Sequence, residues 1–474
     1  MICGGGPSGL AAAILLHQLG WRDIILIERR TSYDYFERGK AFNYQLDGRG
    51  QKMLDFIGLD ETAIQAYGVA NKKFVLNSFD PDGVEKSFEV PFVLKDKQTA
   101  YWMTRSALIA MLHARLEAVN TDGRIRQFYG HSFEGLEIDG AGIEVIAVDS
   151  VSGKKRGFQP QLILGCDGVN SKLRKSLTTF EGLPNKEYEM VVTPSASSSL
   201  LYKVIRLPKV FNVNGQESTL TDHNKSYVFT STYKALDERL SLFSLPVARE
   251  HDPRSANIIL PKTHKFWAID TVDALRDYLR TAFPQLDIDQ IFPAQEMDEF
   301  LNLKAGKFPD PQYSPSVHAE LEAGGNSMSC VLLGDAAHAF PPDLGLGVNS
   351  ALEDVYLLGQ ELAAGEPIGT AAARYEAARL PESRALVRLV RKVFPHQYNH
   401  VPWRFKISMA KFFMQLGLTK ISGGLIDPPG FKLCQNEKLS YRDLEKRILM
   451  TDATLYAALA LILGGVFYLI SKVF

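Results

Sequence analysis

The sequence predicts an α/β fold with an inserted, mainly β domain, C-terminal helices and a terminal transmembrane helix. Three observations predict it. A glycine motif opens the chain before an apolar helix and strand, two later apolar strands end in Asp-Gly and Gly-Asp, and an uncharged apolar run closes the chain. This pattern is typical of a Rossmann-like nucleotide-binding domain. We expect the chain to divide into a discontinuous nucleotide-binding domain (1–187 and 301–380), a substrate domain (188–300), a C-terminal helical region (381–450) and a tail anchor (453–470).

The glycine motif has the G-x-G-x-x-G spacing, with Gly4, Gly6 and Gly9. The first glycine makes a tight turn, the second lets backbone approach a pyrophosphate, and the third lets helix and strand pack closely. Residues 10–19 are apolar and alanine-rich, which predicts a helix whose N-terminal N–H groups face the phosphates. Only three residues precede Gly4, so the first strand is either very short or truncated.

Acidic and basic side chains follow this motif at positions where they could bind a nucleotide cofactor. Residues 24–27 read as a buried strand that ends at Glu28, where a carboxylate can accept a ribose hydroxyl. Arg38 lies in a polar loop, where it either holds a cofactor phosphate or ribose or is simply solvated. Arg105 follows Thr104, a capping residue at the start of a predicted helix over 107–118, within reach of a bound cofactor.

Two further strands end in carboxylates. Residues 162–166 lead to Asp167, at a position where open α/β sheets bind ligands. Residues 330–334 lead to Asp335, which can accept hydrogen bonds from a polyol chain, and the backbone N–H groups of residues 345–349 can stabilise an anion. His338 invites a catalytic interpretation, but a histidine beside an Ala-Ala turn is more often structural.

The remaining elements are predicted from periodicity and turn chemistry. We expect a helix over 47–58, a hairpin over 74–92, short strands at 200–204, 227–230 and 240–245, and a helix over 272–282.

Composition excludes several classes of protein. The net charge of −1 does not suggest a nucleic-acid binder. The four cysteines are widely separated, which disfavours zinc and a disulfide framework and favours reduced cysteines facing the cytosol.

The apolar run over 453–470 is uncharged and 18 residues long, just enough for a membrane span. Arg442, Lys446 and Arg447 lie upstream and favour a cytosolic location for that side. The alternative is a buried core helix.

The three motifs in this order resemble the single-component FAD aromatic hydroxylases, the para-hydroxybenzoate hydroxylase class. Within the class, segments 38–43, 164–168 and 427–442 and the terminal apolar run are similar to the kynurenine 3-monooxygenases. The resemblance implies a Rossmann-like FAD-binding domain, NADPH and oxygen as cosubstrates, and hydroxylation of an aromatic substrate through a flavin C4a-hydroperoxide. It also implies a tail anchor in the mitochondrial outer membrane, with the endoplasmic reticulum as the alternative, and a cytosolic catalytic domain.

We expect no catalytic side chain and no metal, because the chemistry belongs to the flavin. The predicted cofactor-binding residues are Gly4, Gly6, Pro7, Ser8, Gly9, Glu28, Arg29, Arg38, Arg105, Asp167, Asp335, Pro342, Gly345, Leu346, Gly347, Val348 and Asn349, and the predicted substrate residues are Lys73, Phe74, Phe92 and Phe394.

The substrate residues depart from the kynurenine 3-monooxygenase pattern. Lys72-Lys73-Phe74 and Val90-Pro91-Phe92 stand where that family has an arginine and a tyrosine for the amino-acid carboxylate. Lysine lacks the bidentate fork of arginine, so we expect an altered substrate pocket. Two alternatives stay open: an epoxidase or reductase of an apolar lipid, which the tail and the apolar Leu346 both fit, and a non-catalytic FAD-binding protein.

Overall fold

The computed structural model describes residues 1–35, 37, 43–89, 98–139, 142–184, 186–214, 219–249, 254–393, 395–396, 398 and 401–473, with side chains left out at 139, 458, 459 and 461–473. The predicted site residues Arg38, Phe92 and Phe394 lie outside these ranges.

The central sheet has six strands in the order β22-β23-β12-β1-β2-β8. All neighbours are parallel except β22, which runs antiparallel to β23. The first strand, β1, has two residues and lies in the middle of the sheet. The bounds are β1 Ile2–Cys3, β2 Ile24–Glu28, β8 Ile125–Tyr129, β12 Leu162–Gly165, β22 His318–Ala323 and β23 Asn326–Leu332.

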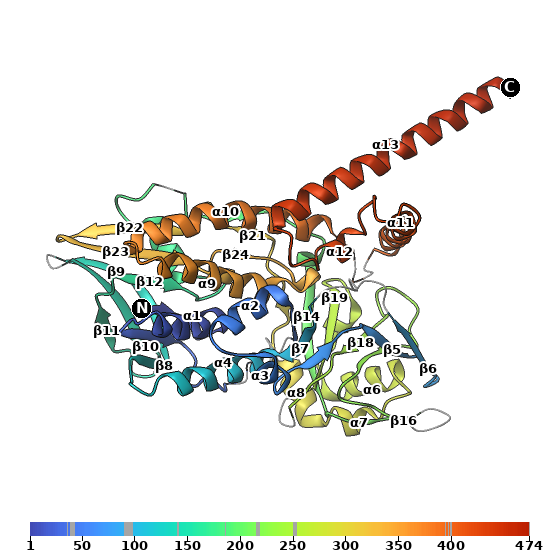
Figure 1. Cartoon of the computed structure of the whole chain (residues 1–474). Coiled ribbons are helices and arrows are strands. Elements are labelled where there is room, and N and C mark those ends of the chain that lie inside the picture. The colour runs from blue at the N-terminus through green and yellow to red at the C-terminus, as the bar shows by residue number, and fades with distance from the viewer. Residues whose placement is uncertain are drawn as a thin grey trace.

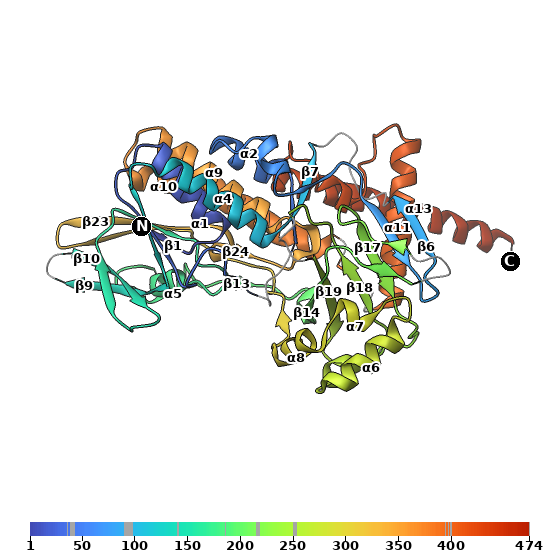
Figure 2. The ribbon, with the colours of Figure 1, turned by 90° about the horizontal axis from the view of Figure 1, so that it is seen from below.

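Helices cover one face of this sheet and a small antiparallel sheet covers the other (Figure 2). The helices are α1 Pro7–Gln18, α4 Arg105–Val119, α9 Gly347–Ala363 and α10 Ile368–Lys392, and the small sheet is β9 His131–Asp139, β10 Gly142–Asp149 and β11 Lys155–Phe158. Helix α1 is buried along most of its length, because its alanines and leucines meet the sheet on one side and α4 and α9 on the other.

A second sheet of seven strands lies beside the first and is backed by short helices (Figure 1). Its order is β20-β14-β19-β18-β17-β5-β6, and its core gathers Phe79, Phe229, Phe283 and Phe292. The bounds are β5 Val75–Phe79, β6 Glu85–Glu89, β14 Leu200–Leu207, β17 Ser226–Thr230, β18 Ser241–Ser244, β19 Arg254–Pro261, β20 Gly306–Lys307, α6 Val272–Ala282, α7 Ile288–Ile291 and α8 Ala294–Asn302.

The predicted hairpin, short strands and 272–282 helix are therefore confirmed within the described residues. The hairpin β5–β6 joins the second sheet although it precedes residue 188 in the chain. The exact domain boundaries stay a prediction.

Smaller elements connect these layers. They are α2 Gly48–Phe56, α3 Glu61–Gln65, α5 Lys172–Thr179, β3 Asn43–Leu46, β4 Val69–Asn71, β7 Ala100–Thr104, β13 Val191–Val192, β15 Asn212–Val213, β16 Thr219–Leu220, β21 Gln312–Tyr313, β24 His338–Ala339 and the 3₁₀ turns η2 Ser197–Ser199, η3 Lys265–Ala268, η4 Gly334–Ala336 and η5 Pro342–Leu344.

The C-terminal region is helical, with α11 Pro402–Ile421, α12 Gly430–Leu433 and α13 Tyr441–Val473. Helix α13 begins against α10 and then extends away from the body (Figures 1 and 2). In the part of the chain that the structure describes, no helix is both long and apolar enough to cross a lipid bilayer. The structure thus gives no support to the terminal transmembrane helix; the side chains of 461–470 lie outside the described set.

All four cysteines are free, and Cys3, Cys330 and Cys434 are buried. Burial raises the pKa of each thiol, to about 12 for Cys434, so these groups are held in the protonated, unreactive form.

Candidate flavin site

The glycines at the start of α1 have three different surroundings. Gly4 has φ +107°, and a Cβ there would lie 2.3 Å from the carbonyl oxygen of Cys166 at the end of β12. A Cβ on Gly9 would lie 1.8 Å from the carbonyl oxygen of Gly4. A Cβ on Gly6 would meet no atom within 4 Å. Gly4 and Gly9 are therefore required by packing, whereas Gly6 borders open space at a helix N-terminus.

Glu28 ends β2 beside this turn and is almost buried. Its carboxylate accepts the backbone N–H of Gly5 at 2.6 Å and that of Arg30 at 2.9 Å. Arg30 donates to Glu37 at 2.7 Å, which ties the loop after β2 to this position. The neighbouring Arg29 is exposed.

The Gly-Asp motif lies against both α1 and α9. A Cβ on Gly334 would lie 3.0 Å from Ser8 Oγ and 3.1 Å from the Cβ of Ala351. Gly334 also has φ +59°, a conformation that favours glycine. The next residue, Asp335, is exposed at the carboxyl end of β23. The start of α1, the Gly-Asp turn and the first turns of α9 thus meet around Gly334.

The Asp-Gly motif ends β12 and starts α5. Asp167 accepts the backbone N–H groups of Lys172 at 2.7 Å and Leu173 at 3.3 Å, so one oxygen caps the helix. Its other oxygen, Oδ1, is buried and has no hydrogen-bond partner. Burial raises the pKa of this carboxyl group. On the same helix, Arg174 donates to the carbonyl of Ala336 at 2.7 Å and so joins α5 to the Gly-Asp turn.

Helix α9 begins directly after a Pro/Gly turn. Gly345 adopts φ +66°, and a Cβ on Gly347 would meet no atom within 4 Å. The first helical hydrogen bond is from Ser350 N to the carbonyl of Leu346, so the three preceding N–H groups have no partner within the helix. Pro342, at the start of the turn, is exposed.

The side chain of Asn349 fixes this helix start. It is fully buried, donates to the carbonyls of Gln45 at 2.8 Å and Gly345 at 3.1 Å, and accepts the N–H of Asp47 at 3.0 Å. Asn349 is therefore placed to shape the loop, with its amide turned towards β3 and α2.

Arg105 lies at the start of α4, where Thr104 caps the helix by accepting the N–H of Ala107 at 3.1 Å. Arg105 lies near the phenol of Tyr44 on β3, and Asp335 is a further charge near that phenol. Burial raises the pKa of Tyr44 and the nearby Arg105 opposes that rise. The sequence did not single out Tyr44, and a tyrosine in a short strand carries no signal that could have done so.

These features fit FAD. Two helix N-termini, those of α1 and α9, each carry a glycine that borders open space, and the exposed carboxylate of Asp335 follows Gly334, which lies against both helices. Helix N-termini stabilise phosphates and anionic rings, and a carboxylate accepts hydroxyl hydrogens.

Several of the predicted residues have other surroundings. The Leu346 side chain is buried in the C-terminal core with Leu386, Leu389 and Leu444, and Val348 is buried in the main core. Lys73 is 71% exposed and lies 3.6 Å from Glu89. The ring of Phe74 contacts that of Trp102, with centroids 6.0 Å apart. Pro7 is partly buried at the start of α1.

His338 is buried, and its Nε2 lies 2.9 Å from Asp354 Oδ2. Asp354 also pairs with Arg379, which donates further to Glu353 at 2.8 Å. Burial opposes the ionised form of Asp354, but Arg379 and His338 outweigh it and hold its pKa below the usual range. This network adjoins the Gly-Asp turn, because Asp354 also accepts the backbone N–H of Gly334.

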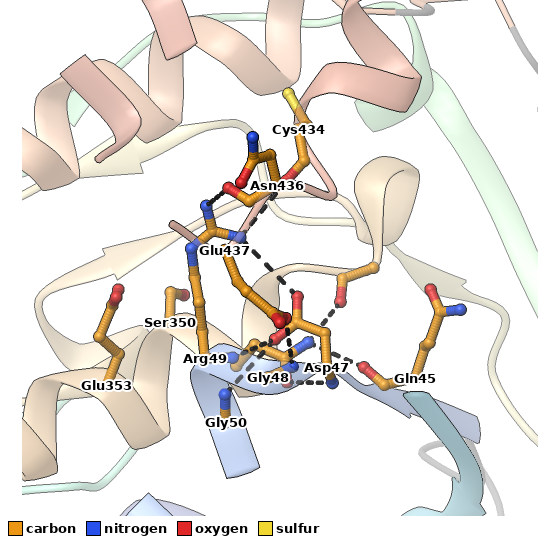
Figure 3. A network of polar contacts seen from close by, with 12 residues as sticks. Gln45, Asp47, Gly48, Arg49, Gly50, Ser350, Glu353, Cys434, Asn436 and Glu437 are labelled. Carbon is orange, nitrogen blue, oxygen red and sulfur yellow. Dashed lines mark hydrogen bonds and ion pairs between the residues drawn. The ribbon is translucent and has the colours of Figure 1, made fainter. Parts of the chain in front are cut away.

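The sequence missed a second network, which joins the N-terminus of α2 to the C-terminal segment (Figure 3). Buried Arg49 donates to the carbonyls of Asn436 at 2.8 Å and Leu439 at 3.0 Å. Glu437 accepts the N–H of Gly48 at 2.9 Å, and Asp47 caps α2. Only the capping preference of Asp47 was visible in the sequence, because the other partners are almost 400 residues apart.

Comparison with known proteins agrees with this geometry. Residues 1–271 and 325–390 match the family described as FAD binding domain, so the chain belongs to that family of flavoproteins. More particularly, it is an FAD-dependent monooxygenase similar to the kynurenine 3-monooxygenases, and the resemblance to the FAD aromatic hydroxylases is confirmed.

The relatives are distant. The kynurenine 3-monooxygenase of Salinispora tropica is 26% identical over 82% of this chain and 78% of its own length, and that of Sus scrofa is 21% identical over 88% and 79%. Among solved structures, 2-methyl-3-hydroxypyridine-5-carboxylic acid oxygenase has a TM-score of 0.57 at 19% identity, covering 84% of this chain and 91% of that one. The tetracycline destructase Tet(51) has a TM-score of 0.56 at 17% identity, covering 90% and 97%. These structures share the fold.

Proposed function

We propose that the chain hydroxylates an aromatic substrate with FAD as its cofactor and NADPH and O₂ as cosubstrates. The observation that carries the proposal is the pair of open helix N-termini at Gly6 and Gly347, with the exposed Asp335 following Gly334, which lies against both helices. This arrangement supports a flavin whose pyrophosphate meets α1 and whose ring meets α9.

The chain's own residues bind, orient and shield. The N–H groups at the start of α9 that have no partner within the helix would hold the ring of a bound flavin and favour negative charge on it, and Asp335 would accept hydrogen bonds from the ribityl hydroxyls. Glu28 offers its remaining lone pairs to the ribose. Bound FAD would supply the electron transfer from NADPH and the delivery of one oxygen atom to the ring. A single dinucleotide motif implies that NADPH docks transiently.

The substrate is an aromatic compound for which kynurenine is one candidate, because the relatives carry that name. The exposure of Lys73 supports an altered pocket. A residue that pairs with the carboxylate of a buried substrate must itself be shielded from water.

The test is a screen of purified protein for NADPH oxidation over aromatic amino acids, phenols and isoprenoids, with product masses recorded. A yellow protein whose product gains one oxygen atom is expected. Gly6→Trp, which fills the space beside the pyrophosphate, is the flavin-free control. A wild-type protein that folds but binds no FAD would contradict the proposal.

An epoxidase or reductase of an apolar lipid is the second candidate. The apolar Leu346 no longer supports it, since that side chain packs into the C-terminal core. The apolar sequence of the tail still favours a substrate that partitions into lipid. A saturated product without added oxygen would identify a reductase, and substrate-independent, negligible NADPH oxidation would identify a non-catalytic flavoprotein.

We also propose that residues 453–470 anchor the chain in the mitochondrial outer membrane or the endoplasmic reticulum, with the catalytic domain in the cytosol. The support is the uncharged sequence of this stretch and the way α13 leaves the body (Figure 1). Full-length protein should resist carbonate extraction from membranes, and Leu463→Lys with Phe467→Lys should release it. Release of the unaltered chain would contradict the anchor.

A further inference from the structure

Helix α11 is packed against the protein along a narrow strip only. It spans 20 residues, Pro402–Ile421, and only Phe412 and Gln415 are buried. Helix α10, of 25 residues, has ten buried residues. The large apolar side chains of α11 and of the turn after it are consequently exposed, namely Trp403 61%, Ile407 60%, Phe413 53%, Met414 52%, Ile421 85% and Leu425 93%.

Most of these side chains form one stripe. Trp403, Ile407, Met414 and Ile421 follow each other at spacings of four and seven residues, so at about 100° per residue they lie within about 40° of arc. Phe412 and Gln415 lie about 100–160° away from the middle of that stripe on the same scale. The exposed stripe therefore faces away from the strip that packs on the protein.

Basic side chains flank the stripe on both sides. Arg404 and Lys411 lie on one side of it and Lys406 and Lys420 on the other, and residues 402–426 contain no aspartate or glutamate. The Arg404 guanidinium lies 5.1 Å from the centre of the Trp403 ring. An apolar stripe between cationic flanks is the pattern of a helix that lies in the interface of an anionic membrane.

Polar contacts hold the helix in this orientation. Gln415 donates to the carbonyls of Asp427 at 3.1 Å and Pro428 at 3.2 Å, and Lys411 pairs with Asp452 of α13 at 2.8 Å. Both ribbon views place α11 beside α13, at the end of the molecule opposite to the N-terminal sheet (Figures 1 and 2).

We propose that the stripe Trp403, Ile407, Met414 and Ile421 of α11 lies in the headgroup–acyl boundary of an anionic lipid bilayer. Charge complementarity selects this occupant. A second copy seated symmetrically on the stripe would bring the cationic flanks of both helices together without an acidic partner on α11. An interfacial helix does not need the length or all-round apolarity of a span. The proposal concerns attachment and is independent of the reaction.

The test places an environment-sensitive fluorophore on the full chain at Ile407→Cys. The matched control is Val151→Cys, 86% exposed on the turn between β10 and β11. The vesicles contain phosphatidylcholine with or without phosphatidylserine, and lipids brominated on the acyl chains serve as quenchers. The label at 407 should be quenched on the anionic vesicles while the label at 151 stays unquenched.

A second pair of variants tests the cationic flanks. In the full chain carrying Leu463→Lys and Phe467→Lys, whose tail no longer anchors it, Lys406→Gln with Lys420→Gln should lower partition onto anionic vesicles by roughly 30-fold, as expected for two basic residues near the surface. Lys154→Gln with Lys262→Gln removes the same charge elsewhere and should leave partition unchanged. NADPH oxidation is not a readout here, so failure of the proposed reaction would not affect the result.

Three results would overturn the proposal. The first is flotation of the chain with vesicles while the label at 407 remains unquenched, which would mean attachment by the tail alone. The second is the absence of flotation. The third is a dimer in sedimentation without lipid that Ile407→Glu abolishes, which would assign the stripe to a second copy.

Discussion

Asp354 on α9 accepts a hydrogen bond from the backbone N–H of Gly334 at 2.7 Å. This bond ties α9, which follows the Pro/Gly turn, to the end of β23, next to Asp335. The same carboxylate pairs with Arg379 of α10 and contacts His338. A buried charge network therefore holds the Gly-Asp turn of the candidate flavin site through the backbone N–H of Gly334.

Asp354→Asn should lower the free energy of unfolding by about 3–5 kcal/mol, because it leaves Arg379 buried without its main partner. Urea unfolding followed by circular dichroism measures the change. Glu353→Gln is the matched control, since Glu353 contacts the same guanidinium but is 20% exposed, and it should cost less than about 1 kcal/mol. Equal losses in the two variants would show that Asp354 is not the central partner.

Gly6→Ala and Gly9→Ala should have opposite effects. A Cβ at Gly6 meets open space, and Gly6 has φ −79°, so the apoprotein should keep its stability while FAD affinity falls at least about tenfold. A Cβ at Gly9 collides with the carbonyl of Gly4, so Gly9→Ala should destabilise the apoprotein itself. Thermal unfolding without FAD and quenching of flavin fluorescence on binding separate the two effects. Unchanged FAD affinity in Gly6→Ala would show that the pyrophosphate does not bind at the start of α1.

The parts of the site that sequence could predict are those encoded within a few residues. An apolar strand followed by glycines of special backbone geometry is a pattern that a few neighbouring residues encode. It occurs at Gly4, at Asp167, and at Asp335 with the loop before α9. Their convergence around Gly334 follows from parallel strands having their carboxyl ends on one edge.

The parts that sequence missed depend on distant partners or on the direction of a side chain. In the sequence, Arg49 has the features of a surface arginine. In the fold it is bonded to the carbonyls of Asn436 and Leu439, which are distant in the chain. Leu346 lies in the predicted loop, but periodicity does not show that its side chain turns towards α10 and α13. Lys73 lies on the expected segment, and only the fold reveals its exposure.

The Arg49 network should clamp the C-terminal segment to α2. Arg49→Met leaves the carbonyls of Asn436 and Leu439 without their donor and should lower stability by about 2–4 kcal/mol. Limited proteolysis should then cut between 434 and 441 faster than in the unaltered chain. The exposed neighbour Lys438 provides the control, and Lys438→Met should change neither measurement. A proteolysis pattern identical in all three proteins would mean that the clamp does not restrain this segment.

Asp47 should make stability depend on pH. Burial raises its pKa to about 6 from 3.8, while Arg49 and the capped N–H groups oppose that rise. Between these values the unfolded chain has lost the proton that the folded chain still binds, so the contribution of Asp47 to stability declines as pH rises from 4 to 6. At 1.36 kcal/mol per pKa unit, the decline amounts to roughly 3 kcal/mol.

Asp47→Asn keeps a capping side chain without the ionisation. The difference in unfolding free energy between Asp47→Asn and the unaltered chain should therefore shift in favour of the variant across this window and level off above pH 7. A difference that stays constant from pH 4 to 7 would show that Asp47 titrates normally in the folded protein.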